Sequence, residues 1–167
     1  MIPKLTVRLY GDPILRKKAA AVTSVGVSER MLIKAMLVAM YENKGVGLAA
    51  PQVGVSQQIF VADVGDGPLA IINPKIFKKS GSAKMEEGCL SIPGIKLNVR
   101  RPSEISVQYT DENNQKVEKN LTELLARVFL HENDHLAGKL IIDYATLAQK
   151  AQMRKKLSEL KKLSKNL

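Results

Sequence analysis

The chain contains only two histidines, His131 and His135, which lie four residues apart with Glu132 directly after the first. In a helix, residues four apart lie on one face, so two imidazoles at this spacing can converge on one metal ion. The carboxylate of Glu132 then lies beside the metal, where it can act as a general base on a water molecule. The sequence His-Glu-Asn-Asp-His therefore predicts a hydrolytic metal centre.

Residues 122–139 are expected to form the helix that positions these side chains. Thr122 suits an N-cap and Gly138 is typical of a helix end. Apolar residues recur between them at helical spacing: Leu125, Val128, Phe129 and Leu136. Histidines on a helix are often only solvated or packed in a core. Here, however, both histidines of a histidine-poor chain flank a glutamate at ligand spacing, which favours the metal site.

A catalytic metal normally takes three protein ligands, and Cys89, the only cysteine, is the candidate for the third. It follows the flexible Gly88 and precedes a Ser-Ile-Pro turn, a context typical of a strand or loop edge. Two alternatives stay open: a small buried residue, or a nucleophile with His131 as its base. The nucleophile interpretation leaves Glu132 and His135 without a role.

Residues 45–52, Gly-Val-Gly-Leu-Ala-Ala-Pro-Gln, follow an apolar helix expected at 28–43. Small and cyclic residues let a backbone approach a ligand closely, as in a substrate-binding wall. A helix C-cap followed by a tight loop explains the same residues. A nucleotide-binding loop is rejected, because the third glycine and a preceding strand are missing.

Taken together, these segments closely resemble the peptide deformylase family, which is marked by G-x-G-L-A-A-x-Q, E-G-C-L-S and Q-H-E-x-D-H. In this chain they read 45–52, 87–91 and 131–135, in the same order. The similarity extends over nearly the full length. One departure is Leu130, where the family usually has Gln; it affects packing or fine tuning rather than the ligands or the base.

The resemblance implies hydrolysis of the formyl group from the N-terminal formyl-methionine of nascent peptides, with release of formate. It also implies that Glu132 acts as general base and then as general acid, and that the metal is held by Cys89, His131 and His135. Fe²⁺ is implied as the native ion, and Zn²⁺ or another divalent ion is expected in preparations. The ligand types alone suit Zn²⁺.

Two further roles follow from the resemblance. Gln52 and the backbone N–H of Leu90 would stabilise the oxyanion, since donors of this kind lower the barrier of acyl transfer. The substrate methionine needs an apolar slot, and apolar residues of this chain match the family positions that line one. The alternative is that these side chains only pack in the core. The residues expected to bind substrate are Gly45, Val46, Gly47, Leu124 and Val128.

The pattern of elements predicts an α+β fold in one domain over residues 1–167, with antiparallel β-sheets packed around the central HExxH-bearing helix. A strand is expected at 58–64, and Asn73-Pro74 should break the apolar run after Ile72. Strands 104–110 and 116–121 should form a hairpin. A C-terminal helix is expected at 146–165.

The C-terminal helix is strongly basic, with seven Lys or Arg residues against one acid between Lys150 and Lys165, in a chain of net charge +10. Five residues of this segment are expected to form an apolar stripe along the helix: Leu147, Ala151, Leu157, Leu160 and Leu163. One hypothesis is docking to ribosomal RNA, and the other is a solvated terminal helix that only packs on the domain.

Composition limits the cellular locations and the alternative kinds of protein that remain. A single cysteine forms no internal disulfide, and no apolar run is long enough to cross a membrane. We therefore expect a cytoplasmic protein of bacterial type. An organellar protein that has lost its transit peptide is the alternative. A general metallopeptidase would share the two histidines and Glu132 but usually takes His or Glu as third ligand. A non-enzymatic RNA-binding module explains the charge but not the ligand spacing.

Overall fold

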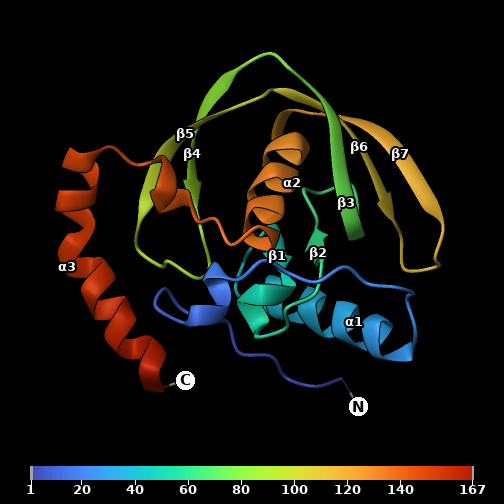
Figure 1. The fold of residues 1–167 in the computed structure, drawn as a ribbon, viewed down its shortest axis with the longest axis horizontal. Coiled ribbons are helices and arrows are strands. Elements are labelled where there is room, and N and C mark those ends of the chain that lie inside the picture. The colour runs from blue at the N-terminus through green and yellow to red at the C-terminus, as the bar shows by residue number, and fades with distance from the viewer. Residues whose placement is uncertain (1, 167) are drawn as a thin grey trace.

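The computed structural model describes residues 2–166, so Met1 and Leu167 of the expected domain lie outside the described residues. Helix α2 (Glu123–Leu136) carries both histidines and runs through the middle of the molecule (Figure 1). Antiparallel sheets lie on either side of it, which confirms the α+β prediction. The helix ends three residues before the predicted end at 139.

The larger sheet has five strands in the order β1-β2-β3-β6-β7, and the smaller pairs β4 with β5. Helices α1 (Val27–Glu42) and α3 (Leu147–Leu163) complete the fold, α1 against β1 and β2 and α3 at the C-terminal end (Figure 1). The strand bounds are β1 Gly47–Ala49, β2 Ile59–Ala62, β3 Leu69–Ser80, β4 Ala83–Gly88, β5 Lys96–Arg101, β6 Glu104–Thr110 and β7 Lys116–Thr122.

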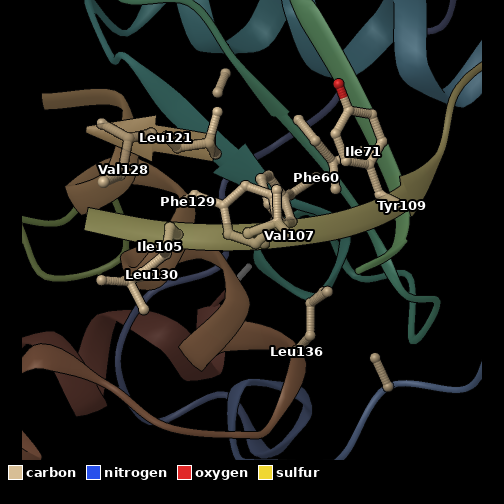
Figure 2. Packing of buried hydrophobic residues seen from close by; sticks show 14 residues of the cluster. Phe60, Ile71, Ile105, Val107, Tyr109, Leu121, Val128, Phe129, Leu130 and Leu136 are labelled. Carbon is tan, nitrogen blue, oxygen red and sulfur yellow. The ribbon is translucent and has the colours of Figure 1, made fainter. Parts of the chain in front are cut away.

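The main core forms where α2 packs on the five-stranded sheet. Phe129 of α2 meets Phe60 of β2 edge to face, with ring centroids 5.0 Å apart, and Tyr109 of β6 lies 6.5 Å away (Figure 2). Leu130, the departure from the family pattern, is buried in the same cluster. An apolar residue is therefore well accommodated at this position.

Asn73-Pro74 follows the buried apolar run as expected, but it does not end the strand, because β3 continues through both residues to Ser80. The pairing with β6 shifts register between Ile72 and Lys75, so the two residues form a bulge. Asn73 has a φ of 50° and donates its backbone N–H to Gln58. A bulge tolerates the missing N–H of proline, which explains why the strand survives.

The start of α2 also differs from the prediction. Thr122 occupies the N-cap position, but its side chain makes no capping hydrogen bond. Instead Glu123 adopts a φ of 53° and donates its N–H to the carbonyl of Ser103. At the other end Gly138 has a φ of 73°, and it closes the helix as predicted.

Residues 45–52 form regular structure rather than a tight loop. Gly47–Ala49 is the edge strand β1, and Ala50–Val53 is a short 3₁₀ helix. The sequence prediction missed this strand because all three of its residues are buried and show no alternation.

The remaining expected elements are present with shifted bounds. The predicted strand at 58–64 is the shorter β2, and β6 and β7 form the predicted hairpin. Thr146 caps α3 together with Gln149. In the part of the chain that the structure describes, no helix combines the length and the apolar character that a membrane crossing requires.

Candidate metal centre

Cys89, His131 and His135 meet at one point, although Cys89 is more than forty residues away in sequence. It follows the last residue of β4, and the two histidines lie on one face of α2. Their ligand atoms all lie within 4.8 Å of one another, and Cys89 Sγ lies 3.3 Å from His135 Nε2. Tetrahedral coordination at ordinary bond lengths places ligand atoms about 3.5 Å apart, so this donor set fits a divalent ion.

The two histidines differ in their surroundings. Burial, supported by the charge of His131, holds the pKa of His135 well below its ordinary value, so this ring is neutral, as a ligand must be. Burial opposes protonation of His131 as well, but contacts with Cys89 and Glu87 raise its pKa well above the ordinary value. His131 Nδ1 lies 2.9 Å from a carboxylate oxygen of Glu87, which leaves Nε2 on the side of Cys89.

Glu132 is 4% exposed and has one buried oxygen, Oε2, without a hydrogen-bond partner among residues 2–166. Burial raises the pKa of this carboxyl to about 7, against the opposing charge of His131. A buried carboxyl that titrates near neutrality and faces a cavity beside metal ligands has the properties of a general base.

Glu87 is the centre of a buried ion cluster that the sequence analysis did not identify. Its carboxylate accepts hydrogen bonds from Arg101 Nε at 2.6 Å and from Arg127 Nη1 at 2.7 Å. Burial alone would raise the pKa of Glu87, but hydrogen bonds from His131 and Arg101 lower it to about 2. Glu87 therefore stays ionised and accepts the Nδ1 proton of His131, as carboxylates behind metal-bound histidines commonly do.

A signal for Arg101 was present in the sequence. Residues of β5 alternate between exposed and buried, and Arg101 occupies an inward position after Leu97 and Val99. The period-two pattern thus predicts a buried arginine, which requires a buried partner. Arg127 of α2 gave no such signal. It also donates to the carbonyls of Val99 and Ala83, which ties α2 to the smaller sheet.

Gln52 is fully buried, and both ends of its carboxamide are held. Its oxygen accepts the N–H of Ala49 at 2.8 Å, and Nε2 donates to Ser91 Oγ at 3.1 Å and lies 3.6 Å from Cys89 Sγ. The N–H₂ group is therefore aimed at the ligand cluster, as expected for an oxyanion donor. Ser91 was not identified from the sequence.

A cavity of about 650 Å³ opens onto this cluster. All five residues expected to bind substrate line it, and Leu90, Gln52, Cys89, His131 and Glu132 line it as well. Val46 and Leu124 are 45% and 42% exposed, so ordinary core packing does not explain their apolar side chains. Val128 lies deeper, within both the wall and the core.

Comparisons with known proteins agree with this geometry. A family model described as polypeptide deformylase matches residues 4–151. A peptide deformylase from Thermotoga maritima is 46% identical over 155 residues, which cover 92% of this chain and 94% of that protein. One from Nitrosococcus oceani is 45% identical and covers 96% and 98%. The crystal structure of the peptide deformylase from Thermus thermophilus superposes with a TM-score of 0.90 at 40% identity, covering 95% and 98% of the two chains.

Proposed function

This chain belongs to the polypeptide deformylase family, and from that premise we propose that Cys89, His131 and His135 hold its metal ion. The protein is a metal-dependent hydrolase that removes the formyl group from the N-terminal formyl-methionine of nascent polypeptides and releases formate. The observation that carries the site assignment is the convergence of one thiolate and two imidazoles beside the buried Glu132.

A divalent ion, when bound, supplies Lewis acidity that brings the pKa of water from about 15.7 towards 7. The chain supplies the proton transfers. Glu132 takes the proton of the attacking water and then gives it to the departing amine, which cannot leave as an anion. A carboxyl whose pKa is about 7 is suited to both steps at neutral pH.

Two donors from the chain would stabilise the negative charge that develops on the formyl oxygen. Gln52 presents its amide N–H₂ from an orientation fixed by Ala49 and Ser91. Leu90 follows Cys89 directly, so its backbone N–H is held close to the metal ligands whatever its side chain does. Loss of one such donor typically raises the barrier by about 2.7 to 4 kcal/mol.

The methionine side chain of the substrate is assigned to the apolar part of the cavity. Val128 forms its inner wall, and Val46 and Leu124 form its mouth. The backbone of Gly45 and Gly47 lies along the same wall and leaves room for an extended peptide. We propose that residues 1–167 act as one catalytic domain around this cavity, and that the protein works in the cytoplasm.

Fe²⁺ is proposed as the native ion, although the donor set binds Zn²⁺ more tightly. Cysteine thiolates and ferrous ions are both oxidised in air, so activity should depend on anaerobic preparation. Metal analysis of protein purified without oxygen tests this assignment.

We further propose that α3 binds ribosomal RNA. The predicted apolar stripe is only partly correct: Leu160 is buried, but Leu147 and Leu163 are 87% and 54% exposed. Arg154, Lys155 and Lys162 lie exposed on this helix, where phosphates could reach them.

One assay tests the central proposal. Formate release from formyl-Met-Ala-Ser should be fast, whereas unformylated Met-Ala-Ser should not be cleaved. Cleavage of the ordinary peptide bond instead would indicate a general metallopeptidase.

A further inference from the structure

Asp134, within the His-Glu-Asn-Asp-His sequence, has no role in the chemistry described above. Its carboxylate oxygen Oδ2 lies 2.9 Å from Arg101 Nη1 and accepts the phenol O–H of Tyr144 at 2.6 Å. Among residues 2–166 these are the only side-chain hydrogen bonds of Asp134. The carboxylate therefore joins a surface tyrosine to a buried arginine.

Arg101 connects this pair with Glu87. Its Nε and Nη2 donate to the two carboxylate oxygens of Glu87 at 2.6 and 3.0 Å, in a two-point contact that fixes the plane of both groups. The guanidinium also lies over the ring of Tyr144, with 4.9 Å between Cζ and the centroid. Its side chain is 4% exposed, so water offers no substitute for a lost partner.

Glu87 in turn holds His131 Nδ1 at 2.9 Å. A continuous series of hydrogen bonds thus runs from Tyr144 through Asp134, Arg101 and Glu87 to the imidazole. The partner of a ligand's second nitrogen fixes the tautomer and the orientation of the ring. Displacement of Arg101 would therefore change the orientation of the His131 ring.

Tyr144 itself is well anchored. It ends a short 3₁₀ helix, Ile141–Tyr144, in which Asp143 receives two hydrogen bonds from Arg16, at 2.7 and 3.0 Å. Burial, together with the hydrogen bond to Asp134, raises the pKa of Tyr144 to about 12, so the phenol keeps its proton at neutral pH. Tyr144 is therefore a hydrogen-bond donor to Asp134 that is held in a defined position.

We infer that Asp134 and Tyr144 are positioning residues of the metal centre: they hold Arg101 against Glu87, and Glu87 thereby fixes the ring of His131. This inference rests on the proposed role of His131 as a metal ligand. Among the described residues, neither Asp134 nor Tyr144 lines the cavity, so neither contacts a substrate bound there.

The test compares Tyr144→Phe with Tyr41→Phe in the full-length, metal-loaded enzyme. Tyr41 is a matched control, because its O–H also donates to an aspartate, Asp63, at 2.6 Å and its ring is similarly exposed. Zn²⁺ affinity is measured by competition with a chelator, and kcat and KM are measured with formyl-Met-Ala-Ser. Tyr144→Phe should lower metal affinity about tenfold and reduce kcat at unchanged KM.

Asp134→Asn and the double variant with Tyr144→Phe complete the test. Tyr144 also accepts a hydrogen bond directly from Arg101 Nη1 at 3.3 Å, so if both residues act through Arg101, the double variant should lose less affinity than the sum of the two single losses. Tyr144→Phe with the metal affinity of Tyr41→Phe would overturn the inference, and so would a lower melting temperature of the metal-free protein without a change in affinity. Failure of the unmodified protein to bind metal or to release formate would instead overturn the proposed function.

Discussion

Gly47 lies directly against Glu132: a Cβ atom added to Gly47 would come 2.5 Å from Glu132 Oε1 and 2.9 Å from Val128 Cγ1. The edge strand β1 thus passes so close to Glu132, the proposed general base, that only a glycine leaves the carboxylate in place. The glycine is required here by the space it leaves free rather than by an unusual φ angle.

Gly47→Ala should therefore reduce kcat without loss of the metal. The new methyl group must displace the carboxylate of Glu132, and misplacement by about 1 Å can cost 100-fold in rate. Steady-state kinetics and metal content of the purified variant are the measurements. Full activity in Gly47→Ala would show that Glu132 moves freely and is not held for catalysis.

Glu132→Gln should retain its metal and lose activity by several orders of magnitude, because glutamine keeps the shape but cannot accept a proton. Cys89→Ala should lose both its activity and its metal. Elemental analysis and formate release separate the two outcomes. A Cys89→Ala protein that kept both metal and activity would refute the ligand assignment.

Glu123→Gly should be more stable than Glu123→Ala, by about 1 kcal/mol. Both variants remove the charge, but only glycine adopts the φ of 53° without strain. At an ordinary helical position the order is the reverse, with alanine favoured by about 1 kcal/mol. Denaturant unfolding of the two variants decides between these outcomes.

The metal-free protein should lose stability as the pH falls from about 5 towards 2. Glu87 has a folded pKa of about 2 against an ordinary value of 4.5, so its contribution is complete above 4.5 and disappears as the pH falls through 2. Glu87→Gln should be less stable at neutral pH and show a weaker pH dependence in this range. Glu86→Gln is the control, since within residues 2–166 the only ion pair of Glu86 is an exposed one with Lys96.

Replacement of Arg154, Lys155 and Lys162 by glutamate should weaken ribosome binding and reduce its salt dependence. Truncation of α3 is a poorer test, because it would remove the buried Leu160 from the core. Replacement of Lys34, Lys78 and Lys119, exposed on other elements, is the matched control. Equal ribosome binding of both triple variants at low salt would end this proposal, while activity on the short peptide should stay unchanged in each.

The sequence by itself determined the parts of this protein that local geometry controls. The spacing of His131 and His135 places both on one helical face, Gly138 ends that helix, and the β6–β7 hairpin follows from its turn residues. Each depends on residues a few positions apart, where backbone conformation dictates which side chains meet. The resemblance to a family extended these predictions to the cavity-lining residues, which local pattern alone left ambiguous.

Only the tertiary structure decided which distant groups meet. The 3.3 Å contact of Cys89 with His135, the Glu87 and Arg101 pair, and the hydrogen bond of Tyr144 to Asp134 join segments that no local pattern connects. The tertiary structure also carried β3 past Pro74 and left Leu147 exposed. The physical reason is that the burial of a side chain depends on the tertiary fold and not on its residue type. A charged side chain needs a hydrogen-bonded partner only when long-range packing removes it from water.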